Sequence, residues 1–351
     1  MTLNHHENSK ICSGIAFGHA KKSFANRSGT NGEPILDIDG AFANIVRIGN
    51  QNVGITSDGI GTKIEIAERA GIYNTLGFDL VAMVADDLAA MGIEPTNITN
   101  ILDVDVMCPK TIDQLMSGLA TASKLAGIAI TGGEIAELGN RIGGFGNGMH
   151  FNWCSTAIGV AGEKIISGKD IVPGDTIITL AEDGFRSNGF TLARNALERC
   201  YGKNWHTEKF TETQSWSEVL LTPSKIYCPL VNSLKRENIE IHGASHITGG
   251  GVPANLGRIL KPNNLGAELN NLFSPPRPMQ AIARMTDVSD RDAYTHWNMG
   301  NGFLLVTPST SIDAILGKAA TLGYRAQVAG TVTHGPVNIR IGKTIYENPG
   351  K

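Results

Sequence analysis

The chain has 351 residues, a formal net charge of −3 and a sequence pI of about 6.3, so its overall charge offers no general attraction to nucleic acid or to anionic lipid. Its length favours two domains over one, and a hydrophobic fraction of 41% suffices to build a core in each. Glycine accounts for 42 residues, which is above the usual share and predicts many tight turns and close approaches of the backbone to a ligand.

The cysteines and the amino-terminal segment indicate a reducing compartment. No C-x-x-C pair occurs among the five cysteines, which argues against a zinc knuckle or a redox pair. The first 30 residues are polar, and no apolar run approaches the length of a membrane span. We therefore expect a cytoplasmic protein with neither nucleic acid nor membrane as a partner. The cysteines are Cys12, Cys108, Cys154, Cys200 and Cys228.

The first half of the chain reads as strands followed by amphipathic helices. Residues 1–33 lack clear periodicity and predict an irregular arm, with a short helix near 16–25. Strands are expected at 43–48 and 52–57, joined by a turn at Gly49–Asn50. The remaining expected elements are a helix at 79–91, a helix at 112–126 capped by Gly127, a strand at 128–131 that ends at Gly132–Gly133–Glu134, and a strand at 149–161.

A turn at residues 173–175 (PGD) separates the two halves. We place the domain boundary near residue 168, which gives domains of 1–168 and 169–345. The second half alternates strand and helix again, so both halves are α/β or α+β units. Its expected elements are strands at 176–181, 303–307, 325–333 and 336–341, and helices at 189–200, 252–260 and 311–322.

Three carboxylates stand at positions where a cation would explain them. Asp87 continues an apolar helical stripe, where an unpaired charge is costly. Asp58 precedes a glycine-punctuated turn, and Glu134 follows two glycines past a strand. Together they suit Mg²⁺, which takes oxygen ligands and nucleotide phosphates. Lys63 could add a positive charge for phosphate oxygens, and Asp86 is expected to be the solvated neighbour of Asp87.

Two segments of the second half are typical of anion sites. Residues 186–189 (RSNG) open a helix with small polar side chains, although Ser or Asn there also serves as an ordinary N-cap. Residues 246–251 (HITGGG) place three glycines between a strand-like segment and a helix, which leaves backbone N–H groups for phosphate. The G-x-x-x-x-G-K-[ST] and G-x-G-x-x-G patterns are absent, so neither a Walker loop nor a Rossmann site is supported.

The ordered set of these segments resembles the phosphoribosylformylglycinamidine cyclo-ligase (aminoimidazole ribonucleotide synthetase) family. The combination is specific although each piece alone is not, and it covers most of the chain. The matching stretches are DGIGTK (58–63), DLVAMVADDLAAMGIEP (79–95), GGEIAE (132–137), SNGFTLAR (187–194), LTPSKIY (221–227), HITGGG (246–251) and NMGNG (298–302).

The resemblance implies an ATP-dependent ring closure in purine biosynthesis, with ATP and Mg²⁺ as cofactors and a small-molecule nucleotide as substrate. It implies an α/β (α+β) fold in which an N-terminal mixed domain pairs with a second copy into a barrel, in a homodimer, and is followed by a C-terminal α/β sandwich domain. Catalysis would rest on positioning and charge neutralisation during phosphoryl transfer.

Carried over residue by residue, the resemblance assigns three kinds of site residue. The implied metal ligands are Asp58, Asp87 and Glu134. The implied catalytic residues are Lys63, Asn188 and His246. The implied ATP- or phosphate-binding residues are Asp58, Gly59, Gly61, Thr62, Lys63, Ser187, Thr248, Gly249, Gly250 and Gly251.

Departures from the family pattern keep other functions open. Arg186 stands where the family usually has His, and the loop after Glu137 lacks the usual Met-Pro-Gly. One alternative is another ATP-using enzyme of the superfamily, of the thiamine-monophosphate kinase, selenophosphate synthetase or hydrogenase-maturation type. The other is a nucleotide-binding homologue without catalytic activity.

Overall fold

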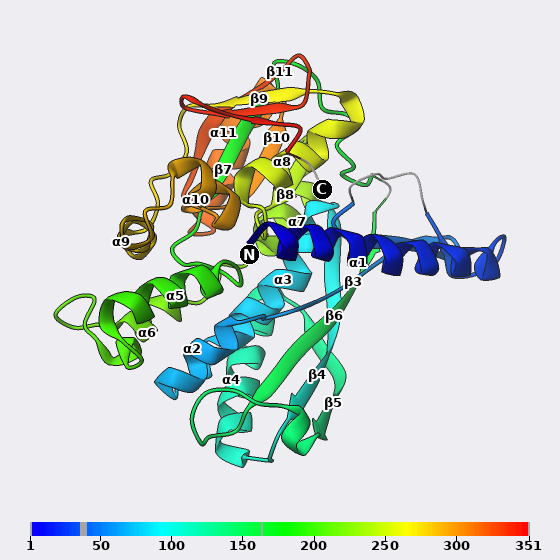
Figure 1. The fold of residues 1–351 in the computed structure, drawn as a ribbon. Helices are drawn as coiled ribbons and strands as arrows, with labels where there is room; N and C mark the ends of the chain where they lie inside the picture. The colour runs from blue at the N-terminus through cyan, green and yellow to red at the C-terminus, as the bar shows by residue number, and fades with distance from the viewer. Residues whose placement is uncertain (1, 36–40, 163, 350–351) are drawn as a thin grey trace.

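The computed structural model describes residues 2–35, 41–162 and 164–349, and within them the chain forms two separate mixed sheets with helices packed against them (Figure 1). All strands of the first sheet precede residue 162 and all strands of the second follow residue 175. The predicted α/β fold class is confirmed. The domain boundary at residue 168 falls between the two sheets and stays a prediction.

The first sheet has six strands in the order β1-β2-β3-β6-β4-β5, with only β4 and β5 parallel. Side chains of β6 alternate between buried and more exposed positions, as expected for a strand with two different faces. The strands are β1 (Glu33–Pro34), β2 (Asn44–Ile48), β3 (Gln51–Gly59), β4 (Ile93–Val104), β5 (Ala129–Glu137) and β6 (Phe151–Ala161).

Helices cover one face of this sheet (Figure 1). They are α3 (Leu76–Ala90) and α4 (Pro109–Ala126), while α2 (Lys63–Ala70) packs on α3. The middle helix, α3, is buried almost all round because it packs on the sheet and also on α7 and β8 of the second half. The helix α4 ends where expected, since Gly127 adopts the left-handed conformation, with φ 72°, that favours glycine.

The other face of the first sheet carries exposed apolar side chains. Five of them are between 37% and 50% exposed, and the strand register places them on the face away from α3. An apolar sheet face of this kind is typical of a surface that another protein surface covers. The residues are Ile48, Ile55, Ile101, Ile158 and Val160.

The second sheet has seven strands in the order β13-β12-β9-β11-β7-β10-β8. Its central strand β7 is buried at every position, in keeping with its continuous sequence TIITLA. The strands are β7 (Thr176–Ala181), β8 (Gly243–His246), β9 (Gly266–Leu269), β10 (Asn301–Thr307), β11 (Ala326–Thr333), β12 (Asn338–Ile341) and β13 (Thr344–Glu347).

Helices of the second half surround this sheet and reach toward the first half (Figure 1). The α-helices are α5 (Phe190–Tyr201), α6 (Trp216–Leu220), α7 (Cys228–Arg236), α8 (Gly251–Leu260), α9 (Arg277–Thr286), α10 (Asp290–His296) and α11 (Ile312–Thr321). Short 3₁₀ helices are η1 (Phe24–Arg27), η2 (Gly139–Arg141), η3 (Trp205–Thr207), η4 (Lys261–Asn263) and η5 (Ser309–Ser311).

Several element predictions require correction. The expected irregular arm is largely the helix α1 (Thr2–Ser23), which lacks an apolar stripe and so gave no periodic signal. The strand expected to end at Gly132 continues as β5 to Glu137, because it pairs with β4 along its length. The strand β4 was not predicted, and its only proline, Pro95, coincides with a break in register against β6. In the described part of the chain, no helix combines the length and apolar character needed to cross a membrane.

Candidate functional site

Three glycine-containing turns from both halves of the chain meet at one place. A Cβ atom added to Gly61 would lie 3.6 Å from the carbonyl oxygen of Ser187. A Cβ atom added to Gly249 would lie 3.3 Å from Oδ1 of Asn188. The turn after β3, the turn before α5 and the turn before α8 are therefore neighbours. The first two of these turns are more than 100 residues apart in the sequence. We call this group, residues 59–62, 187–189 and 248–251, the glycine cradle.

Each turn of the cradle leads into the amino terminus of a helix. The N-cap residues are Thr62 for α2, Gly189 for α5 and Gly250 for α8, and none of them caps its helix with a side-chain hydrogen bond. Helix amino termini carry partial positive charge and N–H groups that point outward. Three such ends facing one region make the cradle suited to an anion such as phosphate.

Two buried polar atoms of the cradle have no partner in the described structure. Oγ of Ser187 and Nδ2 of Asn188 are shielded from solvent and make no hydrogen bond within the described residues. A buried polar atom without a partner costs free energy, so such atoms are expected to bond a ligand. Asn188 is thus part of the cradle, and its predicted catalytic role stays a prediction.

The turn before α8 requires glycine for a steric reason. Gly251 has φ 62°, and a Cβ atom there would lie 1.8 Å from the carbonyl oxygen of Tyr294. Asn255 holds the turn from inside, because its Nδ2 donates to the carbonyl oxygen of Gly251 at 2.8 Å. The turn is therefore built into the packing of α8 against α10.

A cavity of about 620 Å³ opens beside the first turn of the cradle, within the size range of small-molecule sites. Its lining includes Gly61, Thr62 and one face of α2. Across the cavity, the backbone N–H of Phe145 donates to Glu68 at 2.8 Å, and Glu68 also contacts His150 Nδ1 at 3.1 Å. Glu68 was not among the predicted site residues, because a single Glu on a helix has no sequence pattern that distinguishes it from a solvated one.

Asp86 and Asp87 differ in burial, and the buried one is Asp86. Asp86 is completely buried, whereas the side chain of Asp87 is 16% exposed. Asp86 accepts hydrogen bonds from the backbone N–H groups of Tyr227 and Cys228 at 2.7 and 2.9 Å, and so binds the amino terminus of α7. The expectation that Asp86 is a solvated neighbour is wrong, because the second half of the chain packs over it.

The three predicted metal ligands do not meet within the chain. Asp58 lies on β3, and its register partners across the sheet are Ser155 on β6, Asn100 on β4 and Gly133 on β5. Three strand spacings of about 4.8 Å each therefore separate Asp58 from β5. Glu134, one residue on, faces the opposite side of the sheet and is exposed. Among the residues that the structure describes, no group of three His, Cys, Asp or Glu side chains could hold a metal ion. The expected three-carboxylate cage is therefore wrong for a single chain.

Lys63 is a structural residue in this fold rather than an open phosphate ligand. Its Nζ lies 2.8 Å from Oδ1 of Asp79, and neither side chain is exposed. It also donates to the carbonyl oxygen of Thr222 at 2.8 Å, which ties the first half to the second. With these partners and no exposed surface, the predicted catalytic and phosphate-binding roles of Lys63 do not fit.

His246 has both ring nitrogens engaged. Nδ1 lies 2.8 Å from Oδ1 of Asp87, and Nε2 lies 2.7 Å from Nη2 of Arg186. Burial, and then the charge of Arg186, lower the pKa of His246 to about 3, so the ring is neutral. The structure leaves His246 no open nitrogen for proton transfer, which corrects the predicted catalytic role.

Arg186 is buried and surrounded by acceptors. Its Nη1 donates to Glu182 Oε2 and to the carbonyl oxygen of Lys225, both at 2.8 Å, and its Nη2 lies 3.0 Å from Asp86 Oδ2. Burial alone would lower the pKa of Arg186, but the carboxylates of Glu182 and Asp86 raise it, so the guanidinium stays charged. Glu182, four residues before Arg186, was not among the predicted site residues.

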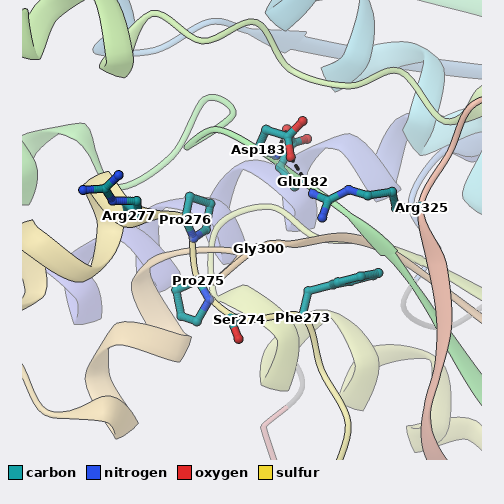
Figure 2. Close-up of a pocket in the computed structure, with 9 residues that line it drawn as sticks. All are labelled: Glu182, Asp183, Phe273, Ser274, Pro275, Pro276, Arg277, Gly300 and Arg325. Carbon is teal, nitrogen blue, oxygen red and sulfur yellow. Dashed lines mark hydrogen bonds and ion pairs between the residues drawn. The ribbon is translucent and has the colours of Figure 1, made fainter. Parts of the chain in front are cut away.

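A second cavity, of about 410 Å³, lies at the end of β7 (Figure 2). Glu182 and Asp183 face it from one side and the segment Phe273–Arg277 from the other. Arg325 contacts Asp183 at 2.7 Å and lies over the ring of Phe273. Because the charged groups there are mostly paired with one another or exposed, the cavity is less suited to an anion than the glycine cradle.

Comparisons with known proteins identify the family of the chain. The family described as AIR synthase related protein, N-terminal domain, matches residues 40–161, and its C-terminal domain matches residues 172–342. A phosphoribosylformylglycinamidine cyclo-ligase of Carboxydothermus hydrogenoformans is 35% identical over 84% of this chain and 84% of its own. One of Pyrococcus furiosus is 35% identical over 90% of this chain and 89% of its own.

Solved structures share the fold at low sequence identity. A HypE–HypF complex superimposes with a TM-score of 0.63 and 18% identity, over 93% of this chain and 98% of the other. A thiamine-monophosphate kinase from Stenotrophomonas maltophilia gives a TM-score of 0.61 and 19% identity, over 92% and 95%. At these identities the likeness concerns the fold alone. The two matched domains and the relatives at 35% identity show that this chain belongs to the AIR synthase related protein family.

Proposed function

We propose that the chain is a phosphoribosylformylglycinamidine cyclo-ligase, an enzyme that uses ATP to close the imidazole ring of aminoimidazole ribonucleotide in purine biosynthesis. The observation that carries the proposal is the glycine cradle, in which three helix amino termini and two unpartnered polar atoms face one region. Relatives that carry this name align over most of both chains. Neither feature favours a kinase or a non-catalytic homologue.

The proposed reaction has two steps. ATP transfers its terminal phosphoryl group to the formyl amide oxygen of formylglycinamidine ribonucleotide, with ADP as the leaving group. An internal nitrogen of the substrate then attacks the activated carbon, and inorganic phosphate leaves as the ring closes. Both steps move negative charge between phosphate oxygens, so fixed N–H donors are the form of catalysis they need.

The residues of the cradle divide naturally between the two ligands. Ser187, Asn188, Thr248 and the glycines at 249–251 would border the substrate phosphate and the reacting centre. The turn of Asp58, Gly59, Gly61 and Thr62 would hold ATP phosphates, with the nucleotide in the adjoining cavity. This division rests on the free donors of the 187–189 turn and on the cavity beside Gly61. Lys63 and His246 would act only by supporting these turns.

Magnesium fits the chain as an ion that arrives with ATP rather than as one held by a protein cage. Mg²⁺ commonly binds through one or two carboxylates plus substrate phosphates, and it keeps several waters. Asp58, near the end of β3, and Asp87, with its partly exposed carboxylate, would be its protein ligands. The ion would neutralise phosphate charge, while the chain's own N–H groups orient the phosphates.

We further propose that the protein works as a cytoplasmic homodimer, with domains of 1–168 and 169–345. The exposed apolar face of the first sheet supports the dimer, because covering isoleucine side chains of this size is favourable. The same face carries Glu134, so a second copy would approach that carboxylate. Covering this face would also complete the barrel expected of the N-terminal domain.

The assay that tests the function is ADP release by purified protein with ATP, magnesium and formylglycinamidine ribonucleotide. We expect release that depends on the ribonucleotide and yields aminoimidazole ribonucleotide. Release stimulated instead by thiamine monophosphate or by selenide would move the chain to another reaction. Binding of ATP without any turnover would contradict the enzymatic role.

A further inference from the structure

Arg186 contacts four separate segments around the glycine cradle. It directly precedes Ser187 of one turn, and its side chain reaches His246, which stands two residues before Thr248 of another. It also contacts Asp86 on α3 and Glu182 after β7. Arg186 therefore links the residue before Ser187 to the strand β8, which leads into the turn at 248–251.

The contact between Arg186 and His246 fixes the position of a proton. A guanidinium group has only N–H donors, so at 2.7 Å the Nε2 atom of His246 must be the acceptor. A neutral imidazole with an unprotonated Nε2 carries its proton on Nδ1. That proton points to Oδ1 of Asp87 at 2.8 Å, an acceptor when ionised. The three side chains thus form one directed chain of hydrogen bonds, from Arg186 through His246 to Asp87.

Arg186 is itself held rigidly. It is 1% exposed, lies between two carboxylates and adopts a backbone φ of 58°, which is costly for a residue with a side chain. A conformation of this kind persists only where the surroundings determine it. The guanidinium has no access to solvent, and its Nε atom is a buried donor without a partner among the described residues.

We propose that Arg186 is a positioning residue that joins two turns of the glycine cradle: its guanidinium donates to Nε2 of His246, so that the turn at 248–251 is fixed against α3 beside Ser187 and Asn188. Any effect of this role on the rate of ring closure rests on the proposed function. The tautomer of His246 and the affinity of the cradle for an anion follow from the geometry alone.

The tautomer can be measured on the unmodified protein. Nitrogen-15 NMR of histidine-labelled protein at about pH 7 distinguishes protonated from unprotonated ring nitrogens. The His246 signal is identified by its loss in His246→Gln. We expect one protonated nitrogen, Nδ1, and an unprotonated Nε2. A proton on Nε2, or a doubly protonated ring, would overturn the proposal without reference to any variant's stability.

A variant then tests the positioning role. Arg186→Lys keeps a positive charge between Asp86 and Glu182 but cannot reproduce the planar fork that also reaches His246. We expect it to bind inorganic phosphate at least about tenfold more weakly by calorimetry, and to show both His246 tautomers. Arg340→Lys, at an exposed pair with Glu268, is the matched control and should behave as the unmodified protein.

The outcomes separate the two proposals. Phosphate binding unchanged in Arg186→Lys, or absent from the unmodified protein, would overturn the positioning role. A single His246 tautomer in Arg186→Lys would overturn it as well. Absence of ribonucleotide-dependent ADP release would overturn the proposed reaction while leaving the tautomer and the phosphate measurements to decide the role of Arg186. Near-ultraviolet circular dichroism of each variant establishes that its tertiary packing is intact.

Discussion

Nζ of Lys63 and Oδ1 of Asp79 lie 2.8 Å apart, and both side chains are shielded completely from solvent. Asp79 also accepts a hydrogen bond from Oγ of Ser224 at 2.5 Å, and Lys63 donates to the carbonyl oxygen of Thr222. This buried ion pair therefore ties α2 and α3 to the segment before α7. A lysine that the sequence motif assigns to phosphate is here part of the contact between the two halves.

We expect Lys63→Met to destabilise the protein by about 3–5 kcal/mol, because it leaves Asp79 buried without its counter-charge. Thermal and denaturant unfolding would measure the loss. Lys164→Met is the control, since Lys164 forms an exposed pair with Asp170 that contributes about 1 kcal/mol or less. A Lys63→Met variant of native stability that has lost only ATP affinity would restore the phosphate role.

The neighbouring aspartates on α3 should respond differently to the same substitution. Asp86→Asn weakens the acceptor for Arg186 and for the amino terminus of α7, and we expect a loss of about 3 kcal/mol in unfolding free energy. Asp87→Asn, at a partly exposed site, should retain the fold and bind Mg–ATP more weakly. Unfolding curves and calorimetry of Mg–ATP binding distinguish the two variants. Unchanged Mg–ATP binding in Asp87→Asn would show that Asp87 is not a metal ligand.

Gly249→Ala should impair the cradle without unfolding the protein. Its backbone does not need a positive φ, but the added methyl group would lie 3.3 Å from Oδ1 of Asn188, inside the proposed phosphate site. We expect inorganic phosphate to bind about tenfold more weakly at an unchanged melting temperature. Gly202→Ala is the control and should lower the melting temperature while leaving phosphate affinity unchanged. The reason is that Gly202 has φ 76°, which strains a residue with a side chain, and has open space around it. Retained phosphate affinity in Gly249→Ala would place the anion elsewhere.

A charge on the open face of the first sheet should dissociate the proposed homodimer. Ile101 is 49% exposed on that face, on β4 next to β6, and Ile101→Glu would have to bury a carboxylate on association. Sedimentation velocity should shift from dimer to monomer. Leu125→Glu, on α4 and 58% exposed, should leave sedimentation unchanged. A dimer that survives Ile101→Glu would require a different interface.

His242 predicts a pH dependence of stability. Burial alone would lower the pKa of His242, but hydrogen bonds to Asp175 at 2.7 Å and Glu240 at 3.1 Å outweigh it and raise the pKa. A raised folded-state pKa gives stability that is complete below the unfolded pKa of about 6.5 and is lost as pH rises through the folded value.

Unfolding of the unmodified protein and of His242→Gln would measure this contribution. The difference in stability should be larger at about pH 6 than at about pH 9, where the histidine is neutral in both states. A difference that is constant, or that grows with pH, would show that the pairs with Asp175 and Glu240 do not stabilise the charged ring.

Local patterns in the sequence were sufficient for much of the fold. The apolar stripes of α3 and α4, the glycine that ends α4 and the buried run of β7 each reflect interactions within one short segment. The glycine turns at 59–61 and 249–251 were also recognisable, because the conformations they adopt restrict the residue type. The helix α1 was not, since neither its composition nor its periodicity marks it.

Charged residues show where local patterns stop being informative. Asp86 and Asp87 are adjacent and chemically identical, and nothing near them in sequence separates the buried carboxylate from the partly exposed one. The difference arises because Arg186 and the amino terminus of α7 arrive from 100 and more residues away to solvate Asp86. Likewise, only strand register shows that Asp58 and Glu134 face opposite sides of a sheet.

The amino-acid sequence by itself determined the family, the α/β class and the glycine turns that can accept phosphate, because these depend on residue types at fixed short spacings. The tertiary structure alone decided which charged side chains are paired inside the protein and which remain for ligands. The physical reason is that the free energy of a charge depends on its surroundings, and distant segments of the chain supply those surroundings.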